Sequence, residues 1–324
     1  MTKSRVIATV TLFLLIATSA IFLFKQPDSS PNHEIILAEN ASPLSTLTII
    51  AHEKGFFKQA GVDVKVSRFT SGKLALDAVL GGAADIATVA ETPIMFAGIA
   101  GQDFRVIATT FLSGNACKVV VRSDHGIAKP SDLKGKKIGT FAGTNAEFFT
   151  KRFLESNNLK VSDVTIVNLT PTDMVIALTK GDIDAYMVWE PFIYNGKAAL
   201  GDRAAIFEAP GIYTTTFNIV AKPDFLQAYP KETAAFIQAL RLASRFALEH
   251  PTDAMATVGN YTNIPVPTLE AVWKDYTFPV TLDDNLVKFL TEQANWAIET
   301  DKVKPPAPDY RKYLDGDFVR SARH

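Results

Sequence analysis

The 324-residue sequence contains almost no cysteine and no excess of positive charge. Cys117 is the single cysteine, so the chain can form neither an intramolecular disulfide nor a cysteine-based metal cluster. Its stability must then come from a large hydrophobic core, in which we expect Cys117 to be buried. The 33 Lys and Arg balance 34 Asp and Glu to a net charge of -1, which argues against a nucleic-acid partner.

Motifs of nucleotide binding and of nucleophilic catalysis are also missing. Gly139 and Gly143 do not have the spacing of a dinucleotide fingerprint, and no P-loop lysine follows them. The five histidines have no metal-ligand spacing, and there is no G-x-S-x-G. We therefore expect no catalytic residue, no metal and no cofactor, so that the protein is not an enzyme.

One long apolar run stands at the N-terminus. Lys3 and Arg5 precede the uncharged residues 6–24, "VIATVTLFLLIATSAIFLF". Positive charge before such a run predicts an export signal, and this run is close to the length that spans a bilayer. We expect residues 1–30 to be a signal peptide or an uncleaved inner-membrane anchor, and the rest to lie in the periplasm or cell envelope.

From residue 35 onward, strand and helix patterns alternate along the chain. Strand patterns cover residues 35–38 and 62–69. Helix patterns cover residues 45–60, 72–80 and 171–180. This alternation predicts an α/β fold with parallel-rich sheets flanked by helices, and the length predicts about two domains.

A strand pattern over residues 137–141 runs through a small-residue turn into a helix. Thr144 and Asn145 are good N-cap residues, and Asn157 and Asn158 are good helix ends. A strand that leads through glycine into a helix N-terminus favours anion binding, because the first N–H groups of a helix are free. The alternative is a capped helix without a ligand.

A faint internal repeat relates two parts of the chain at a shift of 99 residues. It aligns Ser45 with Thr144, Ser71 with Thr170, Gly82 with Gly181, Asp85 with Asp184 and Glu91 with Glu190. These matches fall at helix caps, helix ends and strand ends, which predicts two lobes of like design.

Ligands of such sheets bind outside the carboxyl ends of the strands, near helix N-termini. We therefore expect the side chains at these ends to meet in one cleft between the lobes. Thr92 is expected to be an N-cap with Pro93 at the first helical position. The predicted binding residues are Ser45, Thr46, Ser71, Glu91, Thr92, Thr144, Asn145, Trp189, Glu190 and Tyr213.

Five stretches of the chain carry a resemblance to known transport proteins. They are "AHEKGFFKQAGVDVKV", "FTSGKLALDAVLGGAADIATVAETP", "PSDLKGKKIGTFAGTNAEFF", "VSDVTIVNLTPTDMVIALTKGDIDAYMVWEPF" and "APDYRKYLDGDFV". On these stretches, from about residue 35 to 320, the chain resembles periplasmic solute-binding proteins of ABC transporters, of the sulfonate, taurine and nitrate type. It is also similar to proteins that bind thiamine-pyrimidine precursors.

The resemblance implies a type II periplasmic-binding-protein fold, with two lobes joined by a hinge of two crossing segments. By analogy, residues 35–112 and 223–324 form lobe 1, and residues 113–222 form lobe 2. It implies a monomer that captures a small organic or inorganic anion in the cleft. The partners implied are ABC permease and ATPase subunits.

Two carboxylates leave the ligand class open. Glu91 and Glu190 each either cap a neighbouring helix or pair with a lysine, or they face a cationic or N–H-donating ligand such as an amino-sulfonate or a pyrimidine. Trp189 either stacks on a flat ligand or packs at the hinge. Asp173 is expected to cap its own helix. A membrane-anchored sensor domain is the alternative to a transport function.

Overall fold

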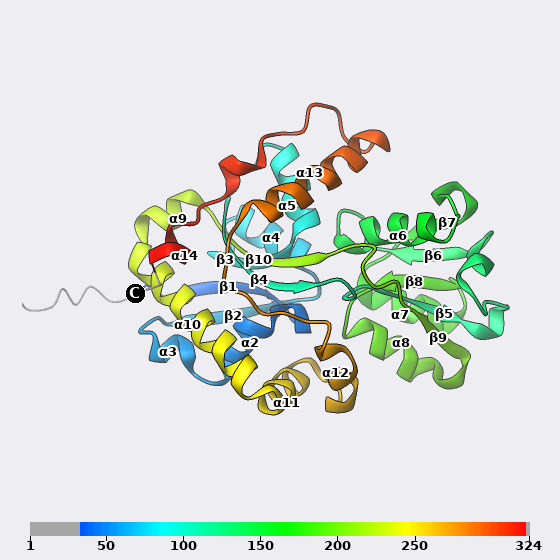
Figure 1. Cartoon of the computed structure of the whole chain (residues 1–324), viewed down its shortest axis with the longest axis horizontal. Coiled ribbons are helices and arrows are strands. Elements are labelled where there is room, and N and C mark those ends of the chain that lie inside the picture. The colour runs from blue at the N-terminus through cyan, green and yellow to red at the C-terminus, as the bar shows by residue number, and fades with distance from the viewer. Residues whose placement is uncertain (1–32, 322–324) are drawn as a thin grey trace, which may run out of the picture. The chain divides into compact units, whose positions relative to one another are not determined.

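Two five-stranded sheets organise the computed structural model, which describes residues 33–321 (Figure 1). The first sheet has, in spatial order, β2 (Val64–Phe69), β1 (Ile35–Asn40), β3 (Ile86–Ala90), β10 (Thr215–Ala221) and β4 (Arg105–Ser113). The second sheet has β7 (Thr165–Asn168), β6 (Lys137–Thr140), β8 (Ala185–Val188), β5 (Lys118–Arg122) and β9 (Ala204–Phe207).

The two sheets have the same topology. In the first, β1 is parallel to β2 and β3, and β10 is antiparallel to β3 and β4. In the second, β6 is parallel to β7 and β8, and β5 is antiparallel to β8 and β9. Each sheet is therefore parallel apart from one strand. The predicted α/β fold with parallel-rich sheets and two lobes of like design is confirmed.

Helices flank both sheets (Figure 1). Those on the second sheet are α6 (Asn145–Ser156), α7 (Pro171–Lys180) and α8 (Phe192–Leu200). The N-terminal helices of the first sheet are α2 (Thr46–Glu53), α3 (Phe56–Gln59), α4 (Gly72–Leu80) and α5 (Glu91–Ile99). The C-terminal ones are α9 (Pro223–Ala228), α10 (Pro230–Glu249), α11 (Pro251–Thr262), α12 (Val266–Trp273), α13 (Asp284–Glu299) and α14 (Asp317–Ser321).

The predicted export signal or anchor, residues 1–30, lies outside the described residues. Within residues 33–321, every helix is too short or too polar to cross a membrane.

The chain crosses between the sheets after β4 and again before β10 (Figure 1). The two crossings touch, because the N–H of Gly211 donates to the carbonyl of Gly114 at 2.9 Å. This is the geometry expected of a hinge with two crossing segments. Since β10 pairs within the first sheet, we propose that the second lobe ends before Thr215 rather than at residue 222.

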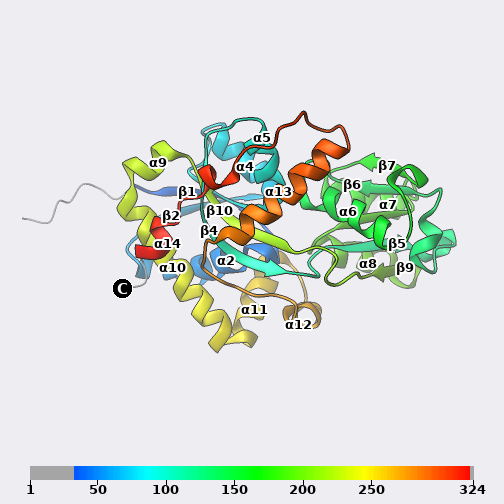
Figure 2. The same ribbon diagram turned by 45° about the horizontal axis from the view of Figure 1, so that its top comes forward.

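Helix α13 reaches from the first sheet to α6 of the second, as Figures 1 and 2 both show. The ring of Trp296 packs edge-to-face on Phe148 of α6, with 5.1 Å between centroids. Beyond the helix, Lys302 forms an ion pair with Glu147 at 2.6 Å. These contacts give the lobes a second connection, separate from the crossing segments.

Two aspartates that the internal repeat aligns, Asp85 and Asp184, have the same structural role in the two sheets. Asp85 and Asp184 each precede the third strand of their sheet. The carboxylate of Asp85 accepts the N–H of Ile36 at 2.8 Å, and that of Asp184 accepts the N–H of Lys137 at 2.9 Å. Each aspartate also donates its own N–H to the carbonyl of the same strand residue at 2.9 Å. Both therefore fix one strand against the next.

Capping explains the starts of α4 and α7. The hydroxyl of Ser71 accepts the N–H of Leu74, and that of Thr170 accepts the N–H of Asp173, both at 3.3 Å. The carboxylate of Asp173 in turn accepts from the Thr170 hydroxyl at 2.7 Å. The predicted caps of these two helices, and the local role of Asp173, are confirmed.

Two helix boundaries differ from the prediction. Helix α5 begins at Glu91 with Ala90 as its N-cap, so the prediction of Thr92 as the cap is wrong. Pro93 is still accommodated, because the first turn of a helix needs no donor at that position. The pattern over residues 45–60 is two helices, since Gly55 takes a left-handed φ of 73° between α2 and α3.

Candidate functional site

All ten side chains predicted to line a cleft are at most 8% exposed. Three of them, Ser71, Thr46 and Thr144, have hydroxyls bound to nearby backbone. Ser71 caps α4, and the hydroxyl of Thr46 donates to the carbonyl of Pro43 at 2.6 Å. The other seven lie at strand ends, at helix starts or near the crossing segments.

A cluster of short polar side chains lies at the carboxyl end of β1. The N–H of Asn40 donates to the hydroxyl of Thr88 at 2.9 Å, and the Thr88 and Ser45 hydroxyls are 3.0 Å apart. The Asn40 amide nitrogen donates to the Ser42 hydroxyl at 3.1 Å. Of these four residues the sequence predicted only Ser45. The strand pattern predicted over residues 35–38 stops two residues before Asn40, where β1 ends.

Among residues 33–321, three buried side chains at or just after the carboxyl ends of strands carry polar atoms without a partner. They are Asn40 Oδ1 at the end of β1, Asn115 Oδ1 after β4 and Trp189 Nε1 after β8. Asn40 is 1% exposed and Trp189 is 2% exposed. A buried polar group without a hydrogen bond costs about 1–3 kcal/mol, so such atoms indicate a missing partner.

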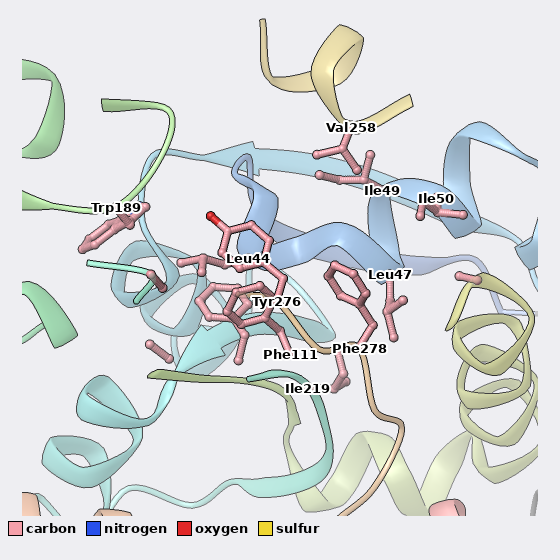
Figure 3. Packing of buried hydrophobic residues seen from close by; sticks show 14 of the residues in the cluster. Leu44, Leu47, Ile49, Ile50, Phe111, Trp189, Ile219, Val258, Tyr276 and Phe278 are labelled. Carbon is pink, nitrogen blue, oxygen red and sulfur yellow. The ribbon is translucent and has the colours of Figure 1, made fainter. Parts of the chain in front are cut away.

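Trp189 packs in the apolar core. Its ring belongs to the same apolar cluster as Leu44, Phe111, Tyr276 and Phe278 (Figure 3). Leu44 and Phe111 come from the first sheet's part of the chain, whereas Trp189 follows a strand of the second. The indole is thus held between the sheets, and its N–H is buried without a hydrogen-bond partner.

The N-terminus of α6 begins at the predicted position, with Thr144 as its N-cap. The Thr144 hydroxyl does not cap the helix but donates to the carbonyl of Phe141 at 2.6 Å. The Asn145 amide donates to Cys117 Sγ at 3.3 Å. The first N–H groups of the helix, which have no acceptor within it, are therefore left for another partner.

Glu91 is buried at the centre of a network inside the protein. Its Oε2 accepts the N–H and the hydroxyl of Thr216, at 2.8 and 3.0 Å. Its Oε1 accepts the hydroxyl of Tyr213 and, at 3.1 Å, the amide of Gln293. Burial raises the pKa of Glu91, and these hydrogen bonds partly offset that effect. The carboxylate joins α5 to β10 and α13, which favours a structural role over contact with a cation.

Cys117 is buried, as predicted, on the crossing segment beside this network. Burial raises the pKa of its thiol to about 12, partly offset by hydrogen bonding to Thr215, and the charge of Glu91 raises it further. The thiol is therefore protonated at neutral pH and acts as a small apolar group.

Glu190 is also buried, and its Oε2 accepts the N–H of Tyr194 in the first turn of α8 at 2.9 Å. Burial raises its pKa to about 7, partly offset by that hydrogen bond and by the charge of Lys118. Lys118 itself forms an ion pair with Glu208. A carboxylate at a helix N-terminus is stabilising, so the capping alternative accounts for Glu190.

A cavity of about 470 Å³ lies where α4 and α5 meet the turn before α6. It is lined largely by apolar side chains, with Lys73, Asp77 and Gly143 at its edge. None of the ten predicted residues lines it, and neither does Asn40. We therefore locate the candidate site at the unpartnered atoms rather than in this cavity.

The buried carboxylates predict an unusual dependence of stability on pH. Glu39, at the end of β1, and Glu190 each have a pKa raised from 4.5 to about 7 by burial. A carboxyl with a raised folded pKa contributes stability that is full below pH 4.5 and lost as pH rises through 7. Each contributes about 3 kcal/mol at most.

We therefore expect the free energy of unfolding to fall as pH rises from 5 to 7.5. Glu39→Gln and Glu190→Gln should each flatten part of this slope. Urea unfolding at several pH values measures it, with the exposed Glu155→Gln as the control. A slope of the opposite sign, or one unchanged in both variants, would contradict the prediction.

Known proteins resemble the chain over most of its length. The taurine-binding periplasmic protein of Escherichia coli (strain K12) is 25% identical over 279 residues, which are 82% of this chain and 86% of the relative. The alkanesulfonate-binding protein SsuA from Xanthomonas axonopodis pv. citri, solved bound to MOPS, superposes with a TM-score of 0.76 at 18% identity. That match covers 87% of this chain and 98% of SsuA.

The periplasmic nitrate-binding protein NrtA from Synechocystis PCC 6803 superposes with a TM-score of 0.70 at 16% identity, covering 90% of this chain and 88% of NrtA. The fold is therefore that of the periplasmic binding proteins, as the resemblance implied. The model of the family described as "NMT1/THI5 like" matches residues 42–254, which are more than half of the chain. On that match, the chain belongs to the NMT1/THI5-like family.

Proposed function

We propose that this protein is the substrate-binding component of an ABC importer and captures a small sulfonate, taurine or nitrate-like anion between its two sheets. The names of the taurine-, alkanesulfonate- and nitrate-binding relatives support this ligand class. They also support a binding role over a catalytic one, and a periplasmic location. Permease and ATPase subunits would be its partners.

The observation that carries the proposal is the buried N–H of Trp189, which has no hydrogen-bond partner. The first N–H groups of α6, which have no acceptor within the helix, are donors of the same kind. An oxyanion accepts hydrogen bonds from such donors without a full countercharge. Asn40 suits the same ligand, because its amide can turn by 180° and keep its bond to Ser42, whose hydroxyl can donate as well as accept. The amide then presents an N–H to the site.

The buried carboxylates weigh against the alternative of a pyrimidine or other cationic ligand. Glu91 is engaged by four donors from Tyr213, Thr216 and Gln293, and Glu190 accepts from α8. Their hydrogen bonds are explained without a ligand. The mechanism we propose is that an anion bridging the sheets favours the closed arrangement of the lobes by its higher affinity for that state.

A thermal-shift screen of the purified protein tests the proposal. The panel contains taurine, ethanesulfonate, nitrate, benzoate and an aminopyrimidine. A ligand at about a hundred times its Kd adds roughly 2.7 kcal/mol, which raises the Tm by several degrees. We expect one or more of the sulfonates or nitrate to do so. Stabilisation by the aminopyrimidine alone, or by no compound, would contradict the proposed ligand class.

A further inference from the structure

A buried carboxylate lies directly behind the candidate site. Glu39 is 0% exposed and precedes Asn40 at the end of β1. Its Oε2 accepts the hydroxyl of Thr48 on α2 at 2.5 Å, and its Oε1 accepts the hydroxyl of Tyr261 on α11 at 2.6 Å. One side chain outside the site thus joins β1, α2 and α11.

The hydroxyl of Thr48 has one proton and two acceptors in reach. Its Oγ1 lies 2.5 Å from Glu39 Oε2 and 3.0 Å from the carbonyl oxygen of Ser45. When Glu39 is ionised, the Thr48 proton points to the carboxylate. When Glu39 is protonated, its O–H can donate to Thr48 Oγ1, and the Thr48 proton turns to the Ser45 carbonyl. Protonation of Glu39 therefore gives the carbonyl of Ser45, a residue of the candidate site, a hydrogen bond from Thr48.

We propose that Glu39 is a positioning residue that makes ligand affinity depend on pH by switching the Thr48 hydrogen bond between Glu39 and Ser45. The proposal rests on the function proposed above, because it assigns an anionic ligand to the site at Ser45 and Asn40. Glu39 acts through Thr48 and has no contact with the ligand.

Charged groups and a cavity lie close to Glu39 on the side of its partner Tyr261. The charged and titratable groups that face it are His52 on α2, Arg68 on β2 and Tyr261 on α11, and the charge of Glu53 acts on Tyr261. A cavity of about 470 Å³ is lined in part by these residues and by Glu53. Burial raises the pKa of Glu39 to about 7, partly offset by Thr48, Tyr261, His52 and Arg68.

Tyr261 is held in place for this role by Arg68. The guanidinium of Arg68 lies 3.7 Å from the centre of the Tyr261 ring and donates to the Tyr261 carbonyl. The tyrosine hydroxyl therefore stays on Glu39 in both protonation states, and the Thr48 side is the one that changes.

The sign of the effect follows from charge. An ionised Glu39 places a negative charge behind a site that binds an anion, whereas a protonated Glu39 is neutral. We expect the affinity for an anion to fall roughly three- to tenfold as pH rises from 5.5 to 8.5. The reason is that the charge of an ionised Glu39 repels an anion bound at the neighbouring residues Asn40 and Ser45. By linkage, the bound anion raises the pKa of Glu39.

Glu39→Gln mimics the protonated state at every pH. Its amide nitrogen can donate to Thr48 and its amide oxygen can accept from Tyr261, so the fold is kept. Calorimetric titration with taurine at pH 5.5, 7 and 8.5 compares this variant with the wild type. Because Glu190 titrates in the same range in both proteins, only their difference is attributed to Glu39.

The expected result is a wild-type affinity that falls more steeply with pH than that of Glu39→Gln, with the two equal at pH 5.5. The exposed Glu155→Gln is the control and should keep the wild-type profile, as should Thr48→Ser, which retains the hydroxyl. An identical pH profile in Glu39→Gln and the wild type would overturn the proposal. So would a steeper fall in Glu39→Gln.

A second measurement needs no ligand and separates this proposal from the proposed function. Ser45–Thr46 is the only Ser–Thr pair in the sequence, so labelling serine carbonyls with ¹³C and threonine amides with ¹⁵N gives one HNCO signal. We expect the Ser45 carbonyl shift to titrate near pH 7 in the wild type and to stay constant in Glu39→Gln. A shift that is constant in both overturns the switch, whether or not taurine binds.

Discussion

Changing Glu91 to alanine is expected to destabilise the protein by about 3–5 kcal/mol, because the buried network around this carboxylate would lose its acceptor. The N–H of Thr216, the hydroxyl of Tyr213 and the amide of Gln293 would then be buried without a partner. Each such group costs about 1–3 kcal/mol. The Tm should fall by about 10 °C, as measured by thermal unfolding without ligand.

Glu155→Ala is the matched control for this variant. Glu155 is an exposed carboxylate on α6 that pairs with Lys151 at 2.7 Å, and its loss should cost less than about 0.5 kcal/mol. If Glu91→Ala kept the wild-type Tm but lost ligand affinity, the carboxylate would be a ligand contact. The structural role would then be wrong, and a cationic or N–H-donating ligand would be favoured.

Trp189→Phe is expected to lower the affinity for the bound anion tenfold or more while leaving the ligand-free protein nearly as stable. A hydrogen bond from Nε1 to a charged acceptor contributes about 1.5–3 kcal/mol to binding. In the ligand-free protein the same N–H has no partner, so its removal eliminates an unsatisfied buried group. Phenylalanine keeps most of the apolar contact with the cluster between the sheets.

Calorimetric titration and thermal unfolding of the same sample measure the two effects. Trp296→Phe is the control, since Trp296 is 4% exposed and packs from α13 on Phe148 of α6. Its affinity should stay within about twofold of the wild type. Equal losses of affinity in both variants would mean that the indole N–H of Trp189 is not a ligand donor.

Local patterns predicted much of the fold because the decisive interactions are close in sequence. The caps at Ser71 and Thr170 use residues three positions away. The matched aspartates Asp85 and Asp184 come from the same strand–helix–strand unit in each half. The repeat at a shift of 99 therefore predicted the duplicated sheet topology.

The chemistry of the site could not be predicted to the same depth, because its partners are far apart in the chain. Glu91 accepts from Thr216 and Gln293, which are 125 and 202 residues away. Glu39 is bound by Tyr261, 222 residues away. The alternation of strand residues indicates none of these distant partners, so the role of the carboxylates could not be decided from the sequence. Asn40 was missed because β1 continues two residues past the predicted strand.

The indole N–H signals of the three tryptophans test the central claim most directly. With ¹⁵N-labelled tryptophan the protein gives three such signals, from Trp189, Trp273 and Trp296, and Trp189→Phe assigns the first. On addition of a stabilising anion we predict that the Trp189 proton moves downfield, because its N–H gains an acceptor. The other two signals should stay almost constant. Binding detected by calorimetry with an unmoved Trp189 signal would contradict an anion site between the two sheets.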